Sequence, residues 1–321
     1  MDAAGSILGV LGGCMGCMVV VENIAKQEPS SMNLMTFSTF LFIATHGLIF
    51  TSKFFTNPIK IPLKGYIPTV AMFFIVNVIN NQALNFHVPV PLHIIFRSGS
   101  LLANLVLTYF LGRRYVTRKY ISVVAITIGI IICTLASSNM EKNSGLSLEE
   151  ASKHYRDWSI GILMLIFALI ASAYMAICQE NLYSTYGKHP EEAMFVTHLV
   201  SLPFFLLMWG SIIDAAEKFS QSKPYDLPIL GEVPNLWVNL ALNCVLQYFC
   251  IHFVYALNAS VDALTVTLVV TVRKFLSLVV SIFWFQNPFT TQHWIGAILV
   301  FGGTLAFADI WGKKTEKKKK N

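Results

Sequence analysis

Residues 120–138 read YISVVAITIGIIICTLASS, a run of 19 residues without a charged side chain. Arg118-Lys119 precedes the run and Glu141-Lys142 follows it. A helix of this length spans about 30 Å, which is the thickness of the hydrocarbon core of a bilayer. The run lacks the strict polar and apolar alternation of a barrel strand, and a helix pairs all of its own backbone amides. Residues 120–138 therefore predict a transmembrane α-helix.

Runs of this kind recur along the whole chain. Of the 321 residues, 55% are hydrophobic and 12% are charged, against about 25% charged in a typical soluble domain. The sequence thus predicts an all-α membrane protein with ten transmembrane helices. We place them at residues 3–22, 34–52, 66–85, 91–111, 120–138, 158–182, 191–213, 235–257, 263–286 and 292–311.

A polar stretch divides the ten predicted spans into two sets of five. We therefore divide the chain into a first half (1–138), a luminal polar linker (139–157), a second half (158–311) and a basic cytoplasmic tail (312–321). The halves resemble each other, since an intramembrane cation precedes an apolar run ending in aromatic residues in both. Because five is odd, equivalent helices would cross in opposite directions, which predicts an inverted repeat with a substrate site between the halves near the midplane.

The distribution of Lys and Arg between the loops predicts the orientation, because cytoplasmic loops carry the excess. With ten spans, the loops on the side of both termini hold 14 of the 23 basic residues and the opposite loops hold 6. Both termini are therefore expected in the cytoplasm.

The three remaining basic residues lie inside predicted spans: Arg97, Arg273 and Lys274. A cation at the centre of a membrane helix costs about 2.5–3.5 kcal/mol, and no acidic residue is expected at the same depth in these helices. A cavity with a positive charge favours an anionic solute, and Arg with Lys suits a phosphate. Adjacent helical residues point about 100° apart, so whether Arg273 or Lys274 faces the cavity is left open.

Other polar residues of the spans are candidates for contacts to a base or a sugar. His93 and Ser100 lie on the same helical face as Arg97, and a bond from His93 to a neighbouring backbone carbonyl is an equal alternative to a ligand contact. Hydrogen bonds between helices would explain the amides of residues 77–81 equally well. The full set is His93, Ser100, Asn77, Asn80, Asn81, Thr197 and His198.

Cofactor and metal motifs are missing from the sequence. The six cysteines all fall in apolar runs, where a thiol behaves as a small hydrophobe, so no disulfide framework is expected. Cys14 and Cys17 form a C-x-x-C pair without a second pair or a nearby histidine. We expect no cofactor, no metal, no nucleic-acid partner and no enzymatic activity.

The C-terminal tail ends in Lys318-Lys319-Lys320-Asn321. Lysines at the third and fourth positions from a cytoplasmic C-terminus fit the dilysine signal for retrieval to the endoplasmic reticulum, read by coat proteins. We therefore assign Lys318 and Lys319 to retrieval, while binding of the basic run to anionic lipids is the alternative.

Four segments resemble the nucleotide-sugar transporters of the drug/metabolite transporter superfamily: NNQAL at 80–84, PLHIIFRSGS at 91–100, LTVTLVVTVRKF at 264–275 and FQNPFT at 285–290. Within that family the resemblance is greatest to carriers of UDP-xylose and UDP-N-acetylglucosamine. It implies import into the endoplasmic reticulum or Golgi lumen in exchange for UMP by alternating access, with Arg97 and Lys274 at the phosphates. The Phe-Tyr-Asn-Asn motif of GDP-mannose carriers aligns with residues 195–198, which lack its Tyr and both Asn.

Two alternatives remain at this stage. One is a carrier of another nucleotide sugar, such as a GDP-sugar, on the same fold. The other is a membrane-embedded enzyme acting on lipid-linked phosphate, which would need carboxylates at the depth of the cations. The sequence also leaves open the preferred nucleotide sugar, and whether the protein is a monomer or a homodimer.

Overall fold

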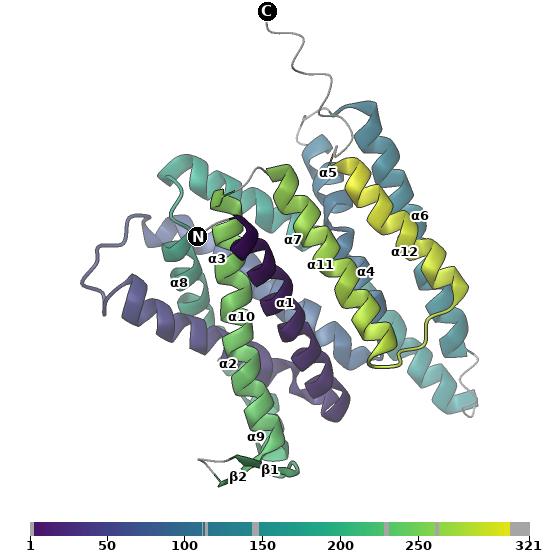
Figure 1. The fold of residues 1–321 in the computed structure, drawn as a ribbon, viewed down its shortest axis with the longest axis horizontal. Helices are drawn as coiled ribbons and strands as arrows, with labels where there is room; N and C mark the ends of the chain where they lie inside the picture. Colours follow the sequence, from purple (N-terminus) through teal and green to yellow (C-terminus); the bar gives the residue numbers. More distant parts are fainter. Residues whose placement is uncertain are drawn as a thin grey trace, which may run out of the picture.

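The computed structural model is a bundle of long α-helices with one short β-hairpin (Figure 1). It describes residues 3–110, 112, 115–142, 148–227, 231–260 and 263–308. The α-helices of these residues are α1 (Ala3–Gln27), α2 (Met32–His46), α3 (Leu63–Gln82), α4 (Val90–Ser98), α5 (Ser100–Phe110), α6 (Thr117–Lys142), α7 (Leu148–Tyr186), α8 (Pro190–Ser201), α9 (Trp209–Ser220), α10 (Asn235–Ser260), α11 (Ala263–Phe283) and α12 (Thr291–Phe307). Short helical segments are η1 (Pro29–Ser31), η2 (Gly47–Thr51), η3 (Ala83–Phe86) and η4 (Leu202–Met208), and the hairpin pairs β1 (Pro224–Leu227) with β2 (Gly231–Pro234).

Eight helical segments of the described residues are long and apolar enough to cross a bilayer, which confirms the predicted class of multi-pass helical membrane protein. The helices α11 and α12 are not among these eight, but α11 packs against α1 and α4, and α12 packs along α6. The number of ten spans remains a prediction.

Three predicted spans are interrupted, where we expected continuous helices. The span at 91–111 divides at Gly99 into α4 and α5. A Cβ atom at Gly99 would lie 2.6 Å from Ile130 Cδ1, so α6 packs closely against this break. The span at 34–52 ends in the π-turn η2, and the span at 191–213 passes through η4, where Pro203 cannot continue the α-helical hydrogen bonds.

Extensive packing joins three pairs of helices: α6 with α12, α1 with α10, and α3 with α7. Figure 1 shows α12 beside α6, and α1 crossing α10. Glycines allow the backbones to approach closely, since a Cβ atom at Gly129 would lie 2.6 Å from the carbonyl oxygen of Gly296. A Cβ atom at Gly303 would lie 3.0 Å from the carbonyl oxygen of Ser122. Of these two contacts, the one nearer the start of α6 is nearer the end of α12, so the two helices are antiparallel.

One end of the bundle is closed where α3 and α8 begin and α7 ends. Tyr66, Leu182 and Phe195 are buried together there. The carboxylate of Glu192, in the first turn of α8, accepts hydrogen bonds from the main-chain amides of Lys60 and Ile61 and from the Tyr66 hydroxyl. These contacts hold the start of α8 to the chain that leads into α3.

Much of the predicted polar linker 139–157 is helical, because α6 continues to Lys142 and α7 begins at Leu148. With 39 residues, α7 is longer than a bilayer crossing requires. The basic tail, with Lys318 and Lys319, lies outside the described residues.

Candidate functional site

A cavity of about 460 Å³ lies inside the bundle. Its walls come from α1, α2, α3 and α4 of the predicted first half and from α7, α8, α10 and α11 of the second. An adjoining cavity of about 400 Å³ shares Arg97 and Arg273 with it. The cavity thus lies between the two halves, where an inverted repeat would place a substrate site.

Arg97 and Arg273 both line the main cavity. Arg97 is in the last turn of α4, two residues before the break at Gly99, and its side chain is open to the cavity. The Arg273 Nε atom is buried without a hydrogen-bond partner, and its Nη1 has only a weak contact, 3.9 Å to Cys250 Sγ. Neither guanidinium forms a salt bridge with a carboxylate of the described residues. Two positive charges in one cavity, without a carboxylate partner among the described residues, make the cavity a site for an anion.

Lys274 lines the adjoining cavity, not the main one. Its Nζ atom donates a hydrogen bond of 3.0 Å to the main-chain carbonyl of Arg97. That carbonyl is near the C-terminal end of α4, where a cation interacts favourably with the helix dipole. Ser100 lines the adjoining cavity beside Lys274. Of the two neighbouring cations, Arg273 therefore faces the main cavity.

The predicted amide cluster of α3 also lines the main cavity. Asn77 donates to the carbonyl of Phe73, and Asn81 donates to Thr36 Oγ1. The Asn80 side chain has no hydrogen bond within the described part of the chain, although most of its surface is buried. Asn80 is therefore the amide of this cluster that is available to a ligand.

The two histidines of the predicted set are held by backbone carbonyls. His93 Nε2 donates to the carbonyl of Asn80, and His198 Nδ1 donates to the carbonyl of Met194. The remaining ring nitrogen of His198 is then an acceptor. His198 packs between the rings of Phe40 and Phe73, and the neighbouring Thr197 donates to the carbonyl of Ala193. The side chains of Thr197 and His198 and the two aromatic rings beside His198 all line the main cavity.

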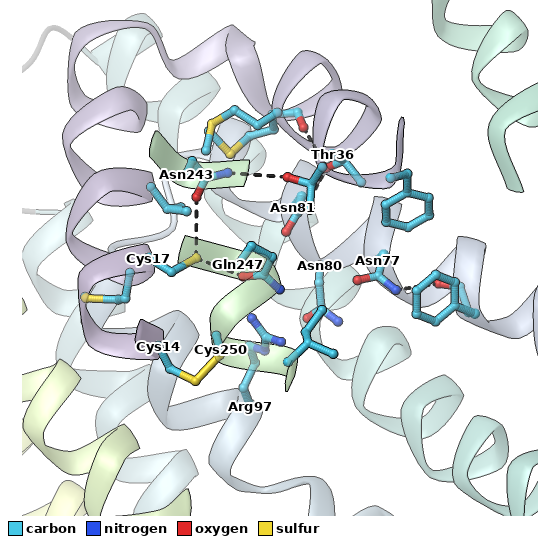
Figure 2. Close-up of a pocket in the computed structure, with 18 of the residues that line it drawn as sticks. Cys14, Cys17, Thr36, Asn77, Asn80, Asn81, Arg97, Asn243, Gln247 and Cys250 are labelled. Carbon is cyan, nitrogen blue, oxygen red and sulfur yellow. Dashed lines mark hydrogen bonds between the residues drawn. A yellow bond between two sulfur atoms is a disulfide. The ribbon is translucent and has the colours of Figure 1, made fainter. Parts of the chain in front are cut away.

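Sequence reasoning missed three amides that line the cavity: Gln179 on α7, and Asn243 and Gln247 on α10. A signal for two of them was present, because amides recur every four residues along α10, at positions 235, 239, 243 and 247. Such spacing places them on one face of the helix. Figure 2 shows Gln247, Asn80, Asn77 and Arg97 around the same open space.

The expectation that the cysteines form no disulfide is wrong. Cys14 of α1 and Cys250 of α10 form a disulfide on the cavity wall, with their Cα atoms 4.6 Å apart (Figure 2). The cysteines are 236 residues apart in sequence, so their spacing gave no indication of the pairing. Gly13 allows the approach, since a Cβ atom there would lie 3.3 Å from the Cys250 amide nitrogen.

Glu22 is an acidic residue at the edge of the cavity that we placed only at the end of a span. Its side chain is 1% exposed, and its Oε1 accepts hydrogen bonds from Ser281 and Asn287. These bonds join α1 to the end of α11 and the loop that follows. Elsewhere in the described residues, no three His, Cys, Asp or Glu side chains are grouped as in a metal site.

Comparison with known proteins gives a match over almost the whole chain. The model of the UAA transporter family matches residues 3–311. An endoplasmic reticulum GDP-fucose transporter of Drosophila melanogaster is 48% identical over 95% of this chain and 89% of its own length. A UDP-xylose and UDP-N-acetylglucosamine transporter of Danio rerio is 45% identical over 97% of this chain and 95% of its own. The human nucleotide sugar transporter SLC35B4 is 43% identical over 94% of this chain and 92% of its own length.

Proposed function

The chain belongs to the UAA transporter family, whose members among its relatives are nucleotide-sugar transporters, and we propose that it exchanges a UDP-sugar for UMP. The proposed substrates are UDP-N-acetylglucosamine and UDP-xylose. The proposed direction is import into the lumen of the endoplasmic reticulum or the Golgi apparatus, by alternating access of the cavity to the two sides.

The observation that carries this proposal is the pair of guanidinium groups without a counter-ion, Arg97 and Arg273, in one cavity. A UDP-sugar carries one negative charge on each of its two phosphates, and UMP carries about two near neutral pH, since the second pKa of its phosphate is near 6. Either ligand neutralises the two arginines, and their planar forks can hold phosphate oxygens with paired hydrogen bonds. Lys274 adds a third charge from the adjoining cavity.

Alternating access by an inverted repeat is supported by which helices pack together. If α1–α6 and α7–α12 are equivalent halves, the first spans of the two halves are α1 and α7, and the third spans are α3 and α10. The packing of α1 on α10 then corresponds to the packing of α7 on α3, and both pairs occur. The fourth spans of the two halves contain α5 and α11, so the α1–α11 contact corresponds to the α7–α5 contact, and both are present. The antiparallel α6–α12 pair repeats its own contact after seven residues, through Gly129 with Gly296 and Ser122 with Gly303. This is the arrangement expected of halves that cross the membrane in opposite directions.

The aromatic group at His198 is the proposed site of the uracil base. The free nitrogen of His198 is a single acceptor between two aromatic rings, and Thr197 donates to its own helix. Uracil presents one ring N–H, which can donate to this acceptor. The second candidate is GDP-fucose, which is favoured by the name of the Drosophila relative.

Two parts of the proposal concern the cell. Retrieval of the protein by coat proteins through Lys318 and Lys319 would concentrate it in the endoplasmic reticulum. Since an empty cavity holds unpaired cations in a bilayer, reorientation should be faster when a nucleotide is bound, which would couple import to export.

The test is uptake of a panel of labelled nucleotide sugars into proteoliposomes that contain UMP, GMP or no nucleotide. We expect rapid uptake of UDP-N-acetylglucosamine or UDP-xylose only with trapped UMP. Preferred uptake of GDP-fucose with trapped GMP would replace the UDP assignment by the second candidate. Equal uptake into vesicles without nucleotide would refute exchange.

A further inference from the structure

The wall formed by α1 and α10 carries a hydrogen-bond network beside the two arginines. The Cys17 thiol donates to Gln247 Oε1 at 2.8 Å and, more weakly, to Asn243 Oδ1 at 3.4 Å. Asn243 in turn donates to Thr39 Oγ1 on α2. The network occupies the oxygen of the Gln247 amide and leaves its Nε2 group without a partner in the described residues.

This network lies on a rigid part of the fold. The Cys14–Cys250 disulfide joins the same two helices one turn away, because Cys14 is three residues before Cys17 and Cys250 is three residues after Gln247. A Cβ atom at Gly16 would contact Leu246 at 3.4 Å, so the helices are in close contact at this level as well. Gln247 is therefore fixed before any ligand binds, which reduces the entropy lost on binding.

The orientation of the amide decides what it can recognise. Cys17 and Gln247 line the same cavity as Arg97 and Arg273. Figure 2 shows the Gln247 side chain facing the same part of the cavity as the Arg97 guanidinium. With its oxygen bonded to Cys17, Gln247 presents only N–H donors there, beside two guanidinium groups that also only donate. Three donor side chains that face one part of the cavity fit the oxygens of a phosphate.

We infer that Gln247 is a third phosphate-binding side chain and that Cys17 is the residue that positions it. The inference rests on the proposed function, and it assigns to the first and tenth helices of the bundle a part in binding the phosphates. Gln247 donates to a phosphate oxygen through Nε2, while Cys17 prevents the amide from turning its oxygen toward that anion.

Reconstituted transport tests Gln247. We expect Gln247→Leu to raise the KM for UMP and the inhibition constant of UMP by roughly tenfold, with little change in maximal rate. The inhibition constant of uridine, which has no phosphate, should not change. Gln247→Glu should raise the KM for UMP further, because its carboxylate repels the phosphates.

The matched control is Asn239→Leu, two turns away on the same face of α10 and outside the cavity. Equal losses for uridine and UMP in Gln247→Leu would overturn the assignment.

The positioning role of Cys17 requires a donor at that position. Cys17→Ser keeps a hydroxyl donor and should retain a KM near that of the wild type, whereas Cys17→Ala should resemble Gln247→Leu. If serine and alanine give the same KM, Cys17 does not act through a hydrogen bond and the inference fails.

Alkylation gives a second measurement that needs no transport. In a variant with Cys133, Cys178 and Cys244 replaced by serine, Cys17 is the only free thiol beside the disulfide. UMP should slow its reaction with N-ethylmaleimide by at least about fivefold, and uridine should not. A variant with Cys178, which lines neither cavity, as its only free thiol should show no protection.

Protection of Cys17 by UMP in a protein that exchanges no UDP-sugar would refute the proposed function but not the phosphate contact. Absence of protection in an active protein would refute the contact alone.

Discussion

The ammonium group of Lys274 donates a 3.0 Å hydrogen bond to the main-chain carbonyl of Arg97. This bond joins α11 to the last turn of α4, the helix that ends at Gly99. Lys274 therefore has two separable properties: a donor that satisfies the end of a broken helix, and a positive charge next to the cavity.

Two substitutions at Lys274 separate these properties. Lys274→Gln retains a donor and removes the charge, whereas Lys274→Met removes both. We expect the glutamine variant to unfold at nearly the wild-type temperature in detergent but to exchange UMP at least about tenfold more slowly. The methionine variant should also be less stable, by about 1–3 kcal/mol for the unsatisfied carbonyl. Full exchange by Lys274→Gln would show that its charge is not used.

The two arginines of the main cavity should be required for affinity. Hydrogen bonds to charged groups contribute about 1.5–3 kcal/mol, so Arg97→Gln and Arg273→Gln should each raise the KM for UMP by roughly ten- to a hundredfold. Arg156→Gln is the control, since the Arg156 side chain is 68% exposed at the start of α7. A KM within twofold of the wild type for both cavity variants would exclude a phosphate site at this pair.

The crossing of α6 and α12 should tolerate no side chain at Gly129. A Cβ atom there would lie 2.6 Å from a backbone oxygen, which cannot move aside as a side chain can. We expect Gly129→Ala to destabilise the protein by about 1–3 kcal/mol, measured as a lower midpoint of thermal unfolding. At Gly302 a Cβ atom would meet nothing within 4 Å, so Gly302→Ala should leave the midpoint unchanged. Equal midpoints for the two variants would contradict the crossing described here.

The Cys14–Cys250 disulfide predicts the number of reactive thiols. When the protein is denatured without a reductant, four of its six cysteines should react with a maleimide, namely Cys17, Cys133, Cys178 and Cys244. After reduction all six should react. Mass spectrometry counts the added groups, and labelling of six thiols without reductant would rule out the disulfide.

The membrane class and the family could be predicted from the sequence, because both depend on features that are continuous along the chain. Long uncharged runs indicate bilayer spans, and segments such as 91–100 carried the family likeness that the match over residues 3–311 confirms. Arg97 and Arg273 could be selected as cavity residues because a charge stands out in an apolar run.

The rest depended on contacts between distant segments. Nothing near Lys274 in sequence indicates that it reaches the carbonyl of Arg97, and the disulfide joins residues from opposite ends of the chain. The glycine at the break between α4 and α5 lies against Ile130 of α6, a contact that the residues around Gly99 do not reveal. Gln247 and the other amides of α10 carry no charge, so they do not stand out in the sequence as Arg97 does, although their four-residue spacing was a signal.

The same disulfide has a consequence for biosynthesis. Cys14 enters the membrane with the first helix, but its partner lies 236 residues later, after most of the chain has been translated. During that interval the Cys14 thiol must stay reduced and must not pair with Cys17, one turn away on the same helix. The covalent bond between the first helix and α10 can then form only after α10 has been made and has met α1, so its presence in isolated protein would be a chemical record of that encounter.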